Sequence, residues 1–190
     1  TDALVSSFID LASGGGTSML WGVEDGMAPL TLPFAVPFYG VDYSTACVST
    51  NGAIYLISSP LECSAFVDFA NTDLNATPPA SLAAVLPFWT DLSFEVPGSG
   101  AVFYGIVAGQ GARRFVVQWQ NAFPAGSTTP VTFQAIFTEG SDSIQYQYKQ
   151  VDLGAGNPAT RGSQATVGIR NSGGVPSLEW SFNVPVLDDG

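Results

Sequence analysis

Carboxylates are the abundant side chains of this sequence that could do acid–base chemistry. The chain has 16 Asp and Glu residues, one lysine (Lys149) and no histidine. Two carboxyls about 5 to 9 Å apart, one with a raised pKa, would suit hydrolysis of a glycosidic bond. The candidates are Glu24, Asp25, Asp91, Glu95, Glu179, Asp188 and Asp189. Sequence spacing does not bring any two of them together, and most acidic side chains are solvated, so we predict no enzyme activity.

The missing histidine removes several other mechanisms. Ser-His-Asp and Cys-His nucleophiles, and His-ligated zinc or haem sites, all need an imidazole. A Ser-Lys hydrolase would need a buried lysine beside a serine. Lys149 alternates with Ile144, Tyr146 and Tyr148 along a predicted strand, so it should lie on the solvent face.

Asp91 is the best single candidate for a calcium ligand, because the apolar run before it suggests partial burial. Calcium takes six to eight oxygen ligands, and the sequence has no DxDxDG loop. The alternative, which we favour, is that this carboxylate accepts backbone hydrogen bonds in a turn. We therefore expect neither a metal nor a cofactor.

Two cysteines, Cys47 and Cys63, lie sixteen positions apart. In an oxidising compartment they would close a loop worth about 3 kcal/mol. In a reducing compartment they would be two buried thiols, and their spacing does not decide between these states. The acidic, lysine-poor composition favours the disulfide.

Planar aromatic rings can stack on sugars, and Trp21 and Trp89 lie in predicted loops or element ends, where an exposed platform is plausible. Trp119, Trp180, Tyr146 and Tyr148 instead fall on strand faces whose alternation predicts core packing. Asn75 opens a formal N-glycosylation sequon, Asn75-Ala76-Thr77, which the prolines that follow weaken.

The overall charge excludes one class of partner. Five basic residues against 16 acidic ones give a formal net charge of -11, so no basic stripe exists to bind a nucleic-acid backbone. The apolar stretches are too short to span a bilayer as helices. The sequence opens without a basic and apolar leader, so Thr1 is expected to be a mature or fragment start.

The elements that must position these residues are predicted to be strands. Period-two alternation recurs between Gly, Pro, Asn and Asp turns, and Thr50-Asn51-Gly52 is a strong hairpin signal. Residues 29–37, with three prolines, should form an edge or extended segment, and residues 81–85 one helical turn at most. The predicted fold is all-β: an antiparallel two-sheet β-sandwich of about ten strands. Its polar faces should carry Gln118, Gln120, Gln145 and Gln147.

Eight segments, in order, resemble the nidogen-type extracellular (NIDO) domain in the form found in bacterial secreted and surface proteins. The first is Leu-Thr-Leu-Pro-Phe-Ala-Val-Pro-Phe-Tyr-Gly at residues 30–40, followed by Val-Ser-Thr-Asn-Gly at 48–52. The others lie at residues 86–92, 102–104, 114–119, 132–137, 144–149 and 165–171. Cys47 and Cys63 are not part of the usual pattern.

The resemblance implies a secreted or cell-surface, non-catalytic module that works in adhesion or as a structural domain, and it supplies no catalytic residues. We expect residues 1–190 to form a single domain, with residues 1–17 as an extended or strand-donating segment. One alternative is the subunit of a surface filament, joined when residues 2–12 add to a neighbour's sheet edge. Another is a carbohydrate-binding accessory domain. The expected partners are extracellular proteins, glycans or copies of the chain, without nucleic acid or membrane insertion.

Overall fold

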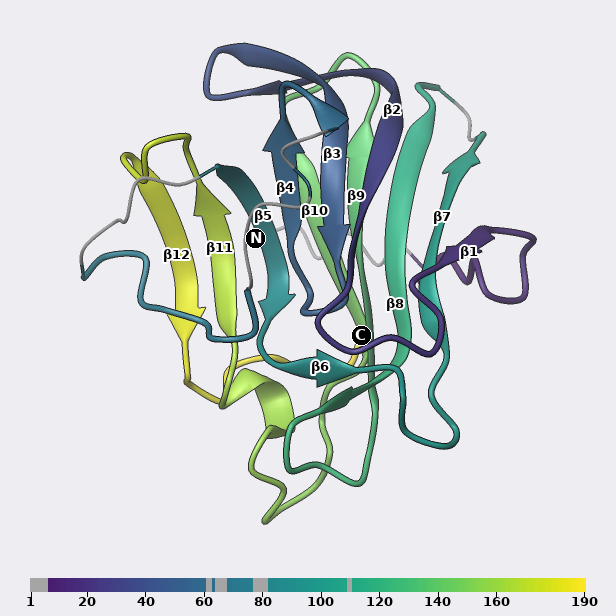
Figure 1. Cartoon of the computed structure of the whole chain (residues 1–190), viewed down its shortest axis with the longest axis vertical. Helices are drawn as coiled ribbons and strands as arrows, with labels where there is room; N and C mark the ends of the chain where they lie inside the picture. Colours follow the sequence, from purple (N-terminus) through teal and green to yellow (C-terminus); the bar gives the residue numbers. More distant parts are fainter. Residues whose placement is uncertain (1–6, 61–62, 64–67, 77–81, 109–110) are drawn as a thin grey trace.

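The computed structural model describes residues 7–60, 63, 68–76, 82–108 and 111–190. Within them the chain forms two six-stranded antiparallel sheets that pack face to face (Figure 1). The strands are β1 (Thr17–Met19), β2 (Met27–Phe38), β3 (Val41–Ser49), β4 (Ile54–Ile57), β5 (Ala83–Trp89), β6 (Leu92–Ser93), β7 (Ala101–Val107), β8 (Arg114–Pro124), β9 (Val131–Thr138), β10 (Ile144–Gln150), β11 (Thr166–Arg170) and β12 (Ser177–Phe182). The all-β sandwich is confirmed, with twelve strands instead of about ten.

The first sheet, sheet I, has the order β1-β7-β8-β9-β10, and β6 pairs with β8 beside this path. The second, sheet II, has the order β12-β11-β5-β4-β3-β2. A short 3-10 helix, Thr160–Gly162, precedes β11. Among the described residues, no helix has the length and apolar character needed to cross a membrane.

The core lies between the sheets and is built from the predicted alternating faces. Phe115, Val117 and Trp119 of β8 are at most 2% exposed, and the inward side chains of β9 are equally buried. The Trp119 ring stacks on Phe133 with ring centroids 5.0 Å apart, and its Nε1 donates to the carbonyl of Ser49 at 2.9 Å. A buried indole therefore has its polar atom paired, as burial requires.

The Asn-Gly hairpin is confirmed between β3 and β4. Gly52 has φ +75°, and a Cβ at this position would overlap the carbonyl oxygen of Phe88. Only glycine fits both the left-handed backbone and the close approach. The proline-rich segment is also as predicted, since it forms β2 at the edge of sheet II, with irregular register between Thr31 and Val36.

The predicted helical turn at residues 81–85 is wrong. Ala83 begins β5, a fully buried strand between β4 and β11, and Ser81 lies outside the described residues. Pairing on both sides supplies the backbone hydrogen bonds of this strand, so tertiary context overrides a weak local preference.

The outer face of sheet I corrects a second expectation, because Gln118 and Gln147 are buried instead of solvated. Residues 8–11 lie across this face. The N–H of Leu11 donates to Gln118 Oε1 at 2.8 Å, and its side chain packs on Val116 and Ile136. Gln118 therefore bonds to the backbone of Leu11 in its own chain instead of lying on a solvated face. Residues 1–6, which include much of the predicted strand donor, lie outside the described residues.

Candidate functional site

The two sheets do not cover each other completely. β10 is the last strand of sheet I, and it lies opposite β5 and β11, because Tyr148 Oη donates to the carbonyl of Pro87 and Tyr146 Oη to that of Gly168, each at 2.8 Å. β12 lies beyond β11 in sheet II. Figure 1 shows β12 at the far left, beyond β11. Sheet II therefore projects past the edge of sheet I.

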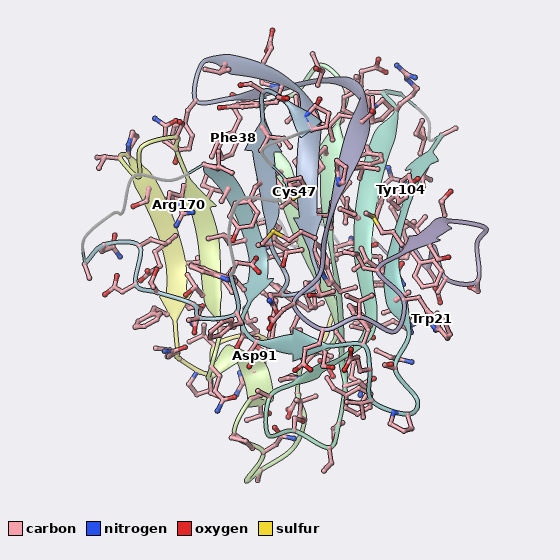
Figure 2. All side chains as sticks on the ribbon, in the orientation of Figure 1. Trp21, Phe38, Cys47, Asp91, Tyr104 and Arg170 are labelled. Atoms are coloured by element: carbon pink, nitrogen blue, oxygen red, sulfur yellow. A yellow bond between two sulfur atoms is a disulfide. The ribbon has the colours of Figure 1, made fainter. Side chains whose placement is uncertain are left out.

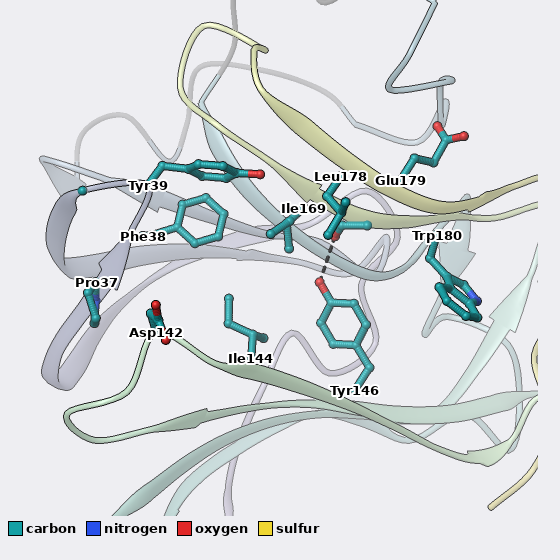
Figure 3. A pocket seen from close by; sticks show the side chains of 12 residues that line it. Pro37, Phe38, Tyr39, Asp142, Ile144, Tyr146, Ile169, Leu178, Glu179 and Trp180 are labelled. Carbon is teal, nitrogen blue, oxygen red and sulfur yellow. Dashed lines mark hydrogen bonds between the residues drawn. The ribbon is translucent and has the colours of Figure 1, made fainter. Parts of the chain in front are cut away.

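This overhang forms an open groove of about 870 Å³ (Figure 3). Its walls come from the end of β2 with its turn, from β10 and from β12. The principal apolar side chains that line it are Phe38, Tyr39, Ile144, Tyr146, Leu178 and Trp180. Asp142 lies at the end near the β2–β3 turn. The groove is thus a mainly apolar surface between two edge strands.

Trp180 contradicts the prediction that it packs in the core. It is 74% exposed, and Leu178 on the same strand is 66% exposed. Both line the groove. Glu179 between them is also a lining residue, but its carboxylate accepts hydrogen bonds from the backbone N–H of Leu74 at 2.6 Å and from Asn75 Nδ2 at 3.1 Å. Alternation separates Leu178 from Glu179, but a register shift in the β11–β12 pairing breaks it at Trp180, and Ser181 pairs with the core residue Val167. It does not reveal that no described strand of sheet I lies opposite.

The tyrosines of β10 remain neutral phenols across the physiological pH range. Burial raises the pKa of Tyr146 well above its ordinary value, with a smaller contribution from Tyr148, and burial also raises the pKa of Tyr148. Burial likewise raises the pKa of the Glu179 carboxyl, although the Leu74 N–H opposes this shift. The hydroxyl of Tyr146 and the carboxylate of Glu179 already form hydrogen bonds within the chain.

A second polar cluster surrounds the hairpin at Asn51. Asp68, 5% exposed, accepts hydrogen bonds from Ser49 Oγ at 2.9 Å and from Asn51 Nδ2 and Tyr55 Oη, each at 3.0 Å. Burial raises its pKa, and these three donors oppose the shift. Each carboxylate oxygen has a protein donor, so the cluster serves to hold the hairpin in place. Asp68 was missed by the sequence reasoning, and no local pattern marks it.

The carboxylates proposed for chemistry fall into separate groups, of which one lies around Glu24. Burial raises the pKa of the Glu24 carboxyl, and the nearby negative charges of Glu95, Asp91 and Asp25 raise it further. Burial, then Asp25, raises the pKa of Asp91, which lies beside β6 (Figure 2). In the described part of the chain, no group of three or more Cys, Asp or Glu side chains is arranged to hold a metal ion.

The C-terminal pair lies elsewhere. Asp188 pairs with Arg161 at 2.5 Å, and Asp189 Oδ1 accepts hydrogen bonds from the backbone N–H groups of Val151 and Asp152. Lys149 is on the solvent face as expected, 3.1 Å from the carboxylate of Asp10.

The remaining sequence-predicted residues are placed as follows. Cys47 and Cys63 form a disulfide. Trp21 is 76% exposed and lies on the side of the molecule away from β12 (Figure 2), whereas Trp89 is 5% exposed and donates from Nε1 to the carbonyl of Asp68. The expectation of an exposed ring at Trp89 is therefore wrong. Asn75 lies in an exposed turn, and Thr77 of its sequon is outside the described residues.

Comparison with known proteins places this arrangement in a family. No curated protein and no solved structure matches the chain significantly. A family model described as "NIDO related" matches residues 2–189, which is nearly the whole chain. The ordered segments found in the sequence, the sandwich and this match agree, and the chain belongs to the NIDO-related family.

Proposed function

We propose that this chain is a non-catalytic extracellular module that works by surface contact, in adhesion or as a structural domain. NIDO domains are typically extracellular, and the Cys47–Cys63 disulfide suits an oxidising compartment. The observation that carries the proposal is the uncovered inner face of β12, where Leu178 and Trp180 are exposed side by side with the groove. An apolar surface of this kind on a folded protein is typical of an interaction site.

The polar side chains support contact over catalysis. Asp68 and Glu179, two carboxylates with raised pKa values, accept hydrogen bonds that hold the hairpin and the residue 71–76 segment. Asp188 and Asp189 tie the C-terminal segment to Arg161 and to the backbone of Val151. These groups stabilise loops, and Glu179 does so although it lines the groove, because its carboxylate is already bonded to Leu74 and Asn75.

The two alternatives stay predictions. A filament built by strand donation from residues 2–12 has less support, because residues 8–11 are bound to sheet I of their own chain. A carbohydrate-binding role would draw on Trp21, the exposed member of the predicted tryptophan pair. A bacterial origin, partners among extracellular proteins, glycans or copies of the chain, and the lack of nucleic-acid and membrane contacts are likewise proposals.

The test is adhesion of beads that carry the purified chain to cells and extracellular material from the organism that makes it. We expect beads with the wild-type chain to attach and beads with Trp180→Ala to attach less. Trp21→Ala, at an equally exposed tryptophan outside the groove, is the matched control. Turnover of a glycan, ester or peptide at a rate abolished by one point mutation would contradict the proposal.

A further inference from the structure

Among the described residues, no strand pairs with β10 on the side away from β9, and its backbone groups there face away from sheet I. In an antiparallel ladder, successive residues point their N–H and C=O groups alternately toward and away from the partner strand. The N–H of Gly190 donates to the carbonyl of Tyr148 at 2.9 Å, so this carbonyl faces away from β9. Tyr146 and Ile144 lie two and four residues earlier and have the same orientation. The chain's own C-terminal residue thus shows that this edge accepts a backbone donor.

The same orientation follows from the other side of sheet I. The N–H of Glu139 donates to the carbonyl of Arg113, so these two residues form a hydrogen-bonded pair. The next pair, Arg114–Thr138 of β8 and β9, is then a non-hydrogen-bonded pair, because the two kinds of pair alternate. When this alternation is followed through the β9–β10 register, the backbone groups of Gln145 and Gln147 are the ones that form hydrogen bonds with β9. Ile144 and Tyr146 therefore direct their side chains into the groove and their backbone groups to its open edge.

A strand added at this edge would complete the sandwich. Neighbouring strands lie about 4.8 Å apart and packed sheets about 10 Å apart. An added strand would therefore lie opposite β12, as β10 lies opposite β11. Its inward side chains would cover Leu178 and Trp180, which are the exposed members of this face. The groove would thus bury apolar side chains and satisfy backbone hydrogen bonds at once.

The polar groups of the groove favour a peptide over a sugar. A sugar site needs several side chains that converge on hydroxyl groups. Here the Tyr146 hydroxyl donates to Gly168 and the Glu179 carboxylate accepts from Leu74 and Asn75. Asp142 is the other charged residue that lines the groove. The other side-chain polar groups of the groove are the Tyr39 hydroxyl, the Trp180 indole N–H and the Asp142 carboxylate, which come from three separate elements. The backbone groups of Ile144 and Tyr146 instead form a row along one strand, and an extended peptide matches this row.

The occupant also needs a suitable charge. The net charge of -11 disfavours close approach of a second copy, and Asp142 adds a carboxylate at one end of the groove. Both favour a segment flanked by lysine or arginine.

We propose that the groove binds an extended segment of a partner protein, which adds to β10 as an antiparallel strand and packs alternate apolar side chains on Leu178 and Trp180. Antiparallel addition follows the pairing of the described strands. This inference rests on the proposed function, since it names the surface and the partner chemistry through which the module would act.

The probe is a set of nine-residue peptides with Val, Leu or Phe at alternate positions, Thr between them and Lys at both ends. Binding to the full chain is measured by fluorescence anisotropy. We expect members of the set to bind, and Trp180→Ala to weaken them about tenfold or more, as for a central aromatic contact. Trp21→Ala should leave the Kd unchanged. Equal thermal unfolding of all three proteins would show that both variants are folded.

A backbone test separates strand addition from simple apolar adsorption. In antiparallel addition, the peptide residues that bond to β10 are those whose side chains face the groove. N-methylation of the apolar residues should therefore abolish binding, whereas N-methylation of the threonines should leave it. The backbone N–H groups of Ile144 and Tyr146 should also exchange hydrogen more slowly with peptide bound.

Three results would overturn the inference: no peptide binding, equal effects of the two N-methylation patterns, or Trp180-dependent binding of neutral oligosaccharides instead of peptides. The bead experiment keeps the two claims apart. If wild-type and Trp180→Ala beads attach equally and no peptide binds, the groove assignment fails while surface contact stands. If wild-type beads do not attach at all, the proposed function itself fails.

Discussion

At the scale of single residues, the four tryptophans divide into two structural and two exposed ones. Trp119 and Trp89 are buried and donate their indole N–H groups to backbone carbonyls. Trp21 and Trp180 are about three-quarters exposed. A large ring left exposed gains no burial free energy on folding, so an exposed tryptophan in an apolar groove is a candidate for contact with a partner.

Alanine substitution should separate these roles. Trp119→Ala is expected to lower the free energy of unfolding by about 3 to 5 kcal/mol, because it leaves a large core cavity. Trp180→Ala should change it by less than about 0.5 kcal/mol. Urea denaturation followed by circular dichroism measures both. A loss of stability in Trp180→Ala comparable to that of Trp119→Ala would mean that this ring supports the fold.

Asp68 gives a prediction about pH. Its pKa is raised in the folded chain, first of all by burial, from an ordinary value of 3.8. The folded state therefore holds this proton more tightly than the unfolded state, so the stabilisation is fully present below pH 3.8. It is lost as the pH rises through the raised pKa. We expect the stability of the wild type relative to Asp68→Asn to fall as the pH rises from 4 to 7. If the stability difference between wild type and Asp68→Asn rose with pH instead, the pKa of Asp68 would be lowered on folding, which contradicts the account.

At the scale of elements, the β3–β4 hairpin depends on one glycine. Gly52 combines a positive φ with contact to the Phe88 carbonyl, whereas Gly15 has a positive φ and no atom within 4 Å of an added Cβ. Gly15→Ala should cost about 1 to 2 kcal/mol, the price of the left-handed backbone. Gly52→Ala should cost clearly more, because β5 must also move. Thermal unfolding of the two variants compares them directly, and equal losses would contradict the close approach.

The strands show what could be read from the sequence. Alternation predicted the buried faces of β8 and β9, and Asn51-Gly52 predicted the hairpin, because both are local patterns. Whether a strand face is covered depends on segments that are far away in the sequence. Gln118 is buried because residues 8–11 cross sheet I, and Trp180 is exposed because sheet II extends past β10. The groove therefore could not be predicted, since it arises from the offset of two sheets whose strands are far apart in the chain.

At the scale of the whole molecule, the Cys47–Cys63 disulfide ties β3 to the segment that follows β4. Closing a loop across a separation of 16 residues should stabilise the chain by about 3 kcal/mol, through loss of entropy in the unfolded state. We expect reductant to lower the urea midpoint accordingly. The double variant Cys47→Ala/Cys63→Ala should show the lower midpoint without reductant and no response to it. An unchanged wild-type midpoint under full reduction would mean that packing alone holds this region.

The acidic charge and the lack of histidine also take their meaning at this scale. In the sequence, these two features excluded several catalytic mechanisms. In the structure, Asp68, Glu179 and Asp189 accept backbone or buried hydrogen bonds that fasten loops to the sheets. The groove is left mainly apolar. The described acids thus serve the fold while β12 exposes apolar side chains, and this division supports the proposed contact function.

The most direct test of this account is attachment of beads that carry the wild-type chain, Trp180→Ala or Trp21→Ala to cells and extracellular material of the source organism. The account predicts attachment by the wild type and by Trp21→Ala, and a marked loss for Trp180→Ala although it is equally stable. Undiminished attachment by Trp180→Ala, or no attachment by the wild type, would contradict contact through the groove.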